Sequence, residues 1–563
     1  MPKPSRSLTH TRREFLSLAA KASALALLPQ PLLALWPSSA PAQHAGHAEN
    51  ARQALPLPGT EGLYGLMRPK GPITLTAAAV PGLLPATGAQ MLAYGAAQDG
   101  RAYQNPILVL QKGQEFRARL VNRLAEPTII HWHGVDGDWR QAGHPSYAVG
   151  PGEAYDYAFP VTNRAGTYWY HPHPHGLTAK QAYLGLASFF IVRDAEEEAL
   201  SRELDLTLGV TDLPIVLADK RFDAQGALVY APSKDDLSMG YLGSEVLANG
   251  QRQPGLSAAT RIYRLRLLNG CTARIFNLRF LRDGRPMSFA LIGNDGGLLD
   301  APRTLEAVFL APGERVELLL DLRGLKPGEE VTLSNAAFDS MHREDMAGMA
   351  GMENMEGMAG MSHGAGHTAP APAGHDAHAA AGSLEEGTAY DILRIRVERE
   401  EAYDRTIPAR LSSLSTAVPA LPRTPPRRFE LALDRHRNLW TIAGLTYDMN
   451  AAPVVVERRA PELWEFAGAK NGMPHPMHLH GYFFRVAARR GSPGQVAERA
   501  VDASGRLATD LGLKDTVLVW PGENVTVVTD FSQPAYKGEQ TFLLHCHNLE
   551  HEDQGMMLNV RVK

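Results

Sequence analysis

Pairs of histidines separated by a single residue occur at four places in this chain. They are His131/His133, His171/His173, His478/His480 and His545/His547. In an extended strand, side chains two residues apart point to the same face, so each pair can present two imidazoles to one site. Imidazole is a good copper ligand, and these eight residues suffice for three metal ions with two or three ligands each. The spacing therefore predicts a histidine site that binds several copper ions.

The last histidine pair encloses a cysteine, Cys546, which by the same alternation points to the opposite face of its strand. His475 is offset from His478 by an odd number of residues and so also faces away from its pair. His551 follows Cys546 by five residues, and Met556 follows by five more. Two histidines, one cysteine and a weak axial methionine form the trigonal blue-copper ligand set. The covalent path from Cys546 to its sequence neighbours would link an electron-accepting site to a second site for dioxygen.

Short strands would have to position these ligands. From about residue 65 onward, Gly, Pro, Asn and Asp separate short apolar runs, and helical periodicity is weak. We expect strands at residues 107–110, 116–121, 155–159, 186–192, 263–268, 316–320, 392–397 and 525–528. Many short strands with frequent turns are typical of β-sandwiches, and 563 residues suit several such domains. We place three domains at residues 60–195, 200–400 and 425–563, with the charged run 193–198 and the proline-rich stretch 419–426 as linkers.

The composition excludes several other classes of protein. The formal net charge is only −4, which gives no electrostatic reason to expect nucleic acid as a partner. Two cysteines cannot form a disulfide scaffold, and we expect Cys271 to pack as a free thiol inside the second domain. We expect a structural role for His175, which follows the second histidine pair, and we interpret His144 as an ordinary loop histidine.

The N-terminus has the features of an export signal. Arg12 and Arg13 precede an apolar stretch at 16–36, and a small-x-small cleavage motif ends at Ala42. The stretch contains Lys21 and two prolines, which makes it a poor membrane span. Residues 1–42 therefore resemble a Tat signal peptide, the alternative being a frayed amphipathic start. We expect a periplasmic or otherwise exported protein with no membrane span in its mature part.

Residues 341–382 depart from the strand pattern, because they consist mainly of Met, Gly, Ala, His and Pro. Six methionines recur at every third position from Met346 to Met361, and four histidines follow. Since this segment lacks the side chains of a packed core, we expect a mobile surface insertion between two adjacent strands of the second domain, near 331–333 and 390–397. Thioether ligands select Cu(I), so the insertion is a candidate Cu(I)-binding segment, the alternative being a linker without function.

The four copper-ligand segments together resemble those of multicopper oxidases. Residues 131–134, 171–173, 475–481 and 545–556 are complete and in family order. Residues 264–271 and 547–557 look like those of bacterial copper-efflux oxidases, and the chain is also similar to bacterial laccases. The resemblance covers nearly all of the mature chain. It implies an all-β fold of three cupredoxin-like Greek-key sandwiches, which reduces dioxygen to water with electrons from Cu(I) or a phenolic reductant.

The resemblance also implies a role for each ligand of four copper ions. The type 1 copper would be held by His475, Cys546, His551 and Met556. The type 2 copper would be held by His131 and His478, and the binuclear type 3 coppers by His133, His171, His173, His480, His545 and His547. Glu552 matches a family acid that feeds protons to dioxygen, the alternative being a solvated surface carboxylate.

The sequence departs from the family at several positions. Many relatives place an aspartate where this chain has Ala142; Asp136 or Asp138 is a candidate substitute, the alternative being a rebuilt loop. Copper-efflux oxidases use Met and Asp near the type 1 copper to bind substrate Cu(I). Met473 fits one such ligand, whereas Asn471 stands where an aspartate is expected. The methionine-rich segment also interrupts the second domain, whereas in those relatives it interrupts the third.

Two other classes of function fit the sequence less well than an oxidase. A copper-storage protein would not need three copper sites of such geometry, and cell-division relatives of this fold lack the ligands that this chain keeps. Within the enzymes, a cuprous oxidase active in copper tolerance and a laccase-like phenol oxidase both remain open. The methionine-rich insertion favours the first. We expect the protein to be a monomer.

Overall fold

The computed structural model describes residues 52–342, 383–458, 461–532 and 538–563. The chain divides into two units, Met1–Ala51, which lies outside the described residues, and Arg52–Lys563. The predicted signal peptide therefore falls outside the described part of the chain, as does the insertion except for Met341 and His342. No helix of the described residues is long and apolar enough to cross a membrane.

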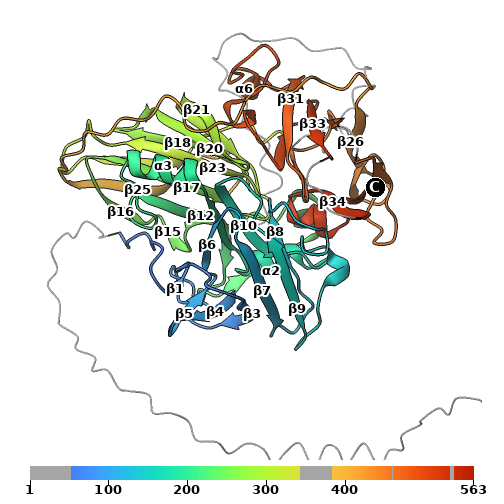
Figure 1. Cartoon of the computed structure of the whole chain (residues 1–563), viewed down its shortest axis with the longest axis horizontal. Helices are drawn as coiled ribbons and strands as arrows, with labels where there is room; N and C mark the ends of the chain where they lie inside the picture. The colour runs from blue at the N-terminus through green and yellow to red at the C-terminus, as the bar shows by residue number, and fades with distance from the viewer. Residues whose placement is uncertain (1–51, 343–382, 459–460, 533–537) are drawn as a thin grey trace, which may run out of the picture. The chain divides into compact units, whose positions relative to one another are not determined.

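Residues 62–193 form a first sandwich of two sheets, blue to cyan in Figure 1. One sheet has the order β1 (Gly62–Leu63), β5 (Arg101–Gln104), β4 (Met91–Gln98), β3 (Ile73–Val80), β7 (Glu115–Asn122) and β9 (Ala154–Pro160). The other has the order β2 (Leu66–Met67), β6 (Ile107–Gln111), β11 (Ser188–Arg193), β10 (Gly166–Pro172) and β8 (Ile130–His133). Strand β7 shows why the sheets pack, because Phe116, Ala118 and Leu120 are buried between exposed neighbours and join one core with residues of both sheets.

Residues 212–399 form the second sandwich, green to yellow in Figure 1. Its larger sheet has the order β15 (Gln251–Arg252), β14 (Glu245–Ala248), β12 (Asp212–Phe222), β17 (Ile262–Asn269), β23 (Arg315–Asp321), β20 (Phe289–Asn294) and β21 (Gly297–Leu305), with β13 (Leu228–Val229) beside β12. The other has the order β16 (Gly255–Ala259), β25 (Tyr390–Arg399), β24 (Glu330–Asn335), β18 (Phe276–Arg282) and β19 (Arg285–Met287), with β22 (Ala307–Leu310) beside β18. Val331 of β24 lies opposite Ile395 of β25 in an antiparallel pair, so the insertion does interrupt two adjacent strands.

Residues 427–562 form the third sandwich, orange to red in Figure 1. One sheet has the order β27 (Leu439–Ile442), β26 (Arg427–Asp434), β29 (Pro461–Gly468), β33 (Asn524–Asp530) and β31 (Phe484–Arg490). The other has the order β28 (Val454–Val456), β35 (Met557–Val562), β34 (Gln540–Cys546), β30 (His475–Leu479) and β32 (Thr516–Val519). The predicted all-β class with three sandwiches is confirmed.

The helices of the described residues are short. They are α2 (Thr178–Tyr183), α3 (Ala195–Glu203), α4 (Lys234–Met239), α6 (Gly494–Ala497) and α7 (Leu549–Asp553), with 3-10 turns η1 (Pro145–Tyr147) and η2 (Ala508–Asp510). The charged run at 193–198 begins at the last residue of β11 and continues into α3, which starts there because Asp194 accepts hydrogen bonds from the first free backbone N–H groups of the helix. Glu197 of this helix is buried against Arg264 and Arg266 of the second sandwich. The segment that joins the first two sandwiches is therefore partly helical and packed.

Candidate metal centres

The first two histidine pairs lie on adjacent antiparallel strands. His131 of β8 is directly opposite His171 of β10, and His133 is opposite Trp169. Trp132, between the first two histidines, points the other way into the core of the first sandwich, where its ring meets Phe116. Alternation along the strand therefore separates ligand positions from packing positions, as the spacing predicts.

The third sandwich repeats this arrangement. His478 of β30 lies opposite His545 of β34, while Met477 lies opposite Cys546. The histidines face one side of this sheet, and the cysteine faces the core of the sandwich together with Met477. Two metal sites are thus placed on opposite faces of the same strand.

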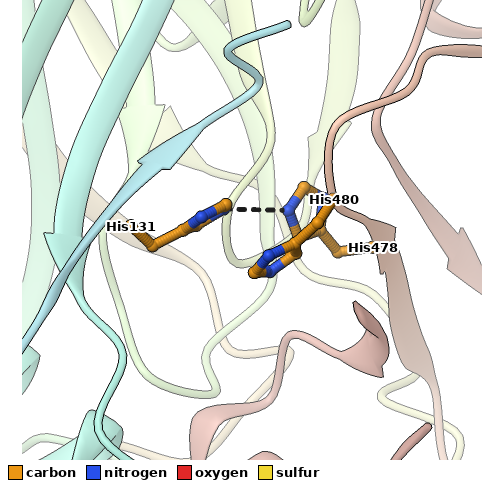
Figure 2. A group of neighbouring side chains, drawn as sticks. All are labelled: His131, His478 and His480. Atoms are coloured by element: carbon orange, nitrogen blue, oxygen red, sulfur yellow. Dashed lines mark hydrogen bonds between the residues drawn. The ribbon is translucent and has the colours of Figure 1, made fainter. Parts of the chain in front are cut away.

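The four pairs meet in one place, the eight-histidine cluster. His131 Nε2 lies 3.3 Å from His478 Nε2, although the two residues belong to different sandwiches (Figure 2). The ring of His480 stacks on His131 with centroids 3.7 Å apart, and that of His133 stacks on His478 at 3.8 Å. His480 Nε2 lies 3.0 Å from His545 Nε2. Every side chain of the cluster is at most 1% exposed, so water does not solvate these imidazoles.

The cluster fits metal ions, because many of its buried nitrogens lack any other partner. Donor atoms within 4.8 Å of one another occur in the groups His131/His478/His480, His131/His133/His171 and His173/His480/His545. No hydrogen-bond partner among the described residues reaches His133 Nδ1, His171 Nε2, or either ring nitrogen of His173 and His547. Unpaired buried polar atoms are rare and costly, and a bound cation would satisfy them.

Protonation does not compete with a metal at these sites. Burial, with neighbouring imidazoles, lowers the pKa of His173 to about 4 and that of His547 to about 3. The rings are therefore neutral near pH 7, which is the state that a metal ligand requires.

The nitrogens that face away from the cluster are held by backbone carbonyls. His131 Nδ1 donates to Ala142 O at 2.5 Å, and His478 Nδ1 donates to Asp515 O at 2.8 Å. Such contacts fix the tautomer and the orientation of a metal-binding ring. At Ala142 the chain therefore contributes a main-chain acceptor where relatives place an acid. Among the described residues, Asp136 and Asp138 belong to none of the converging donor groups, and their substitution for the family acid stays a prediction.

A carboxylate that the sequence reasoning missed is Asp515. Its Oδ1 lies 3.0 Å from His133 Nε2, so the other nitrogen of that ring faces the cluster. Arg315 of the second sandwich donates to both oxygens of Asp515, at 2.8 and 2.6 Å. Gly134 has φ of +81°, and a Cβ there would lie 2.6 Å from Asp515, so this approach requires glycine. The available signal was an acid at the start of the fully buried strand β32.

Glu552 is buried in the face of α7 beside the cluster. Its Oε2 lies 3.1 Å from His545 Nδ1, and its Oε1 lies 3.5 Å from His173 Nε2. Burial alone would raise the pKa of this carboxyl, but the adjacent imidazoles hold it well below its usual range. With 1% of its surface exposed, Glu552 is not the solvated surface carboxylate that was the alternative.

The second site, called here the cysteine site, lies on the opposite side of β34. Cys546 Sγ lies 3.6 Å from His475 Nδ1 and 3.7 Å from His551 Nδ1, and all three side chains are buried. Met556 is fully buried in the same core, and its carbonyl accepts the Cys546 backbone N–H. Burial raises the pKa of the Cys546 thiol, which a coordinated metal would nevertheless deprotonate. The donors match the soft and borderline set that copper prefers.

Comparisons with known proteins agree with this donor set. Family models described as multicopper oxidase match residues 97–197 and 420–563. A protein named multicopper oxidase mco from Staphylococcus haemolyticus (strain JCSC1435) is 30% identical over 460 residues, which cover 81% of each chain. This chain belongs to the multicopper oxidase family. The family makes the protein an oxidoreductase that uses dioxygen, and the histidine groups are compatible with the four copper ions that the family binds.

Two further relatives of this multicopper oxidase bear on its function. The crystal structure of McoA multicopper oxidase from the hyperthermophile Aquifex aeolicus is 34% identical, with a TM-score of 0.74 over 91% of this chain and 100% of that one. A cell division protein FtsP from Photorhabdus laumondii is 29% identical over 459 residues, 80% of this chain and 82% of that one. Overall similarity therefore extends to proteins whose name denotes another role, and the donor atoms must decide between them.

The structure also shows the positions of three other residues with sequence-based expectations, Cys271, His175 and His144. Cys271 is a buried free thiol in the core of the second sandwich, as expected. His175 is exposed and contacts Tyr447, and it belongs to none of the converging donor groups of the described residues. His144 is not an ordinary loop histidine, because it is buried and its Nε2 lies 3.0 Å from Asn559 Oδ1 of the third sandwich.

Proposed function

We propose that this multicopper oxidase oxidises Cu(I) and thereby contributes to copper tolerance. Four Cu(I) ions would each lose one electron while one dioxygen and four protons become two water molecules. The observations that carry this proposal are the methionine-rich composition of residues 341–382 and the positions of the described residues that flank this segment. Export through the Tat route would place the enzyme outside the cytoplasm, where it meets external copper.

The ends of the insertion support a Cu(I) role. After the insertion, Leu384 N donates to Gly243 O at 2.9 Å, and Arg274 donates to the carbonyls of both residues. At the start of the insertion, His342 pairs with Glu386 at 2.9 Å. Gly243 follows α4 by only four residues, and α4 packs against α7, the helix that carries His551. Soft thioether ligands attached at this place can raise the local Cu(I) concentration near the cysteine site.

We also propose which residues would hold each of the four copper ions. The residues of the cysteine site, His475, Cys546, His551 and Met556, would hold the type 1 copper. His131 and His478 would hold the type 2 copper, and the type 3 pair would be held by His133, His171, His173, His480, His545 and His547. Bound copper would accept single electrons at the first site and bind and reduce dioxygen at the others.

The chain itself would carry electrons and protons between solvent and these ions. The peptide bonds that join Cys546 to His545 and His547 form a short covalent path between the two sites. Glu552, a carboxylate in contact with two histidines of the cluster, would accept protons and pass them on at the dioxygen side. A division protein without enzymatic activity would need neither a buried donor cluster nor a buried acid beside it.

The test compares steady-state oxidation of Cu(I) and of a phenol by the purified, copper-loaded enzyme. Deletion of residues 346–378 should weaken Cu(I) oxidation, chiefly at low copper, and leave phenol oxidation unchanged or faster. Replacing the six methionines by leucine keeps the length of the segment and should have the same effect on Cu(I). Copper content should persist, because no proposed ligand lies in this segment. If both variants keep wild-type Cu(I) kinetics at every copper concentration, a laccase-like phenol oxidase becomes the better conclusion.

A further inference from the structure

The imidazoles of the cysteine site are covered by protein on every side. His475 and His551 are each 1% exposed, and Cys546 is fully buried. A reductant in solution therefore cannot touch either ring, although electrons must reach this site from outside. The residues that cover the two histidines decide how that transfer occurs.

One carbonyl oxygen joins the covering residues to a histidine. Ser238 O accepts a hydrogen bond from His551 Nε2 at 2.9 Å and another from the indole Nε1 of Trp440 at 2.7 Å. A carbonyl oxygen has two lone pairs, so both bonds can form together. The first bond keeps the proton on Nε2 and leaves Nδ1 of His551 to face the sulfur of Cys546.

Trp440 itself contacts both histidines of the site. Its ring centroid lies 4.5 Å from that of His475 in an edge-to-face arrangement, and 5.6 Å from that of His551. Both distances are those of direct aromatic contact. Because Trp440 is only 3% exposed and its N–H is bonded to Ser238 O, the indole is fixed in this position.

The helix that supplies Ser238 is anchored to the same site and reaches solvent. Ser233 and Asp236 form a capping box at the start of α4, and Arg221 pairs with Asp236. At the other end of α4, Met239 O accepts a hydrogen bond from Asn548 Nδ2 at 3.3 Å. Asn548 follows Cys546 by two residues in the chain. The last turn of α4 is half-buried, so its outer surface is available to a reductant while its inner carbonyl contacts His551.

We propose that Trp440 and the Ser238 carbonyl form the electron-entry contact of this enzyme. The inference rests on the proposed role of the cysteine site as the type 1 site. The reductant binds at the outer surface of α4 and gives up one electron, as Cu(I) becoming Cu(II) or as a phenol becoming a phenoxyl radical with release of a proton. That electron reaches the cysteine site through the indole and the shared carbonyl. The indole is neither oxidised nor reduced in net terms.

The test measures reduction of the type 1 site without oxygen, as the loss of the blue band after rapid mixing with hexacyanoferrate(II) or with a phenol. Trp440→Leu removes the ring and should slow this step about tenfold or more. Trp440→Phe keeps a ring but removes the N–H donor, and should slow it less. The matched control is Trp464→Phe, which alters another buried indole of the same sandwich, bonded to Glu462, and should leave the rate unchanged.

A second measurement needs no turnover. Cu(II) added to the metal-free protein should quench the emission that Trp440 contributes, obtained as wild type minus Trp440→Phe, and it should do so equally in the Trp464→Phe background. Unchanged reduction rates in Trp440→Leu with an intact blue band would overturn the proposal. If Trp440→Leu lacks the blue band, a wild-type rate in Trp440→Phe together with unquenched Trp440 emission would overturn it. A failure of the Cu(I) proposal alone would still leave the hexacyanoferrate(II) reaction dependent on Trp440.

Discussion

Asp515→Asn should weaken copper binding by the eight-histidine cluster and also lower the stability of the fold, and a matched control distinguishes the two effects. The Asp515 carboxylate accepts two hydrogen bonds from Arg315 and one contact from His133 Nε2, and all three side chains are buried. Removing one partner of a buried ion pair costs about 3–5 kcal/mol of folding free energy. Loss of a residue that orients a metal-binding histidine typically costs about 10- to 100-fold in metal affinity. At ~1.4 kcal/mol per tenfold, that is ~1.4–2.8 kcal/mol of binding free energy.

The matched control is Asp510→Asn. Asp510 is also buried and accepts two hydrogen bonds from an arginine, Arg489, at 2.6 and 2.9 Å, but it contacts no histidine of the cluster. Both variants should unfold at lower temperature. Only Asp515→Asn should lose copper from the cluster during dialysis against a chelator, while the blue colour of the cysteine site persists. Equal copper retention in the two variants would refute the idea that Asp515 orients His133.

Four further outcomes follow from the same geometry. Cys546→Ser should bleach the blue colour and abolish dioxygen reduction, and a colourless variant that stays active would contradict the assignment. Met556→Leu should keep the colour and raise the type 1 reduction potential, since a weak donor is replaced by none; a lowered potential would show that Met556 is not the axial ligand. Glu552→Gln should slow reoxidation by dioxygen far more than reduction of the type 1 site, so equal slowing of both counts against a proton-delivering role. In the copper-free protein, the pKa of His173 is about 4, below its usual 6.5, so the unfolded state binds more protons between these values. Thermal stability of the copper-free protein should therefore fall as the pH drops from 6.5 towards 4, and a flat profile would argue against neutral buried histidines.

Local patterns in the sequence predict most of the fold and the donor set. Strand alternation alone places Cys546 opposite His545 and His547, because that rule depends only on neighbouring residues. The strands expected from apolar runs are present, with boundaries shifted by a residue or two. The burial of Glu197 in the run at 193–198 was not predictable, because a buried acid in a helix has the same composition as an exposed one.

Contacts between distant segments were not predictable in this way. Asp515 and Ser238 act on histidines through positions that no spacing rule connects, and Ser238 acts through its carbonyl, which is common to all residues. Gly313 is a similar case, since its φ is +83° and a Cβ there would lie within 3.0 Å of the His547 ring. The contacts of these residues with the histidines are seen only when the sandwiches are packed against one another.

The contact between His131 and His478 joins residues 347 positions apart and lies where two separately packed cores meet. The place where dioxygen would react therefore belongs to a junction and to neither sandwich. A junction can loosen while each core keeps its strands, so the working lifetime of the enzyme depends on how firmly the sandwiches hold one another. Residues that join the first and third sandwiches without being ligands, such as Trp139, whose backbone N–H donates to Gln540, should then govern durability as the ligands govern chemistry.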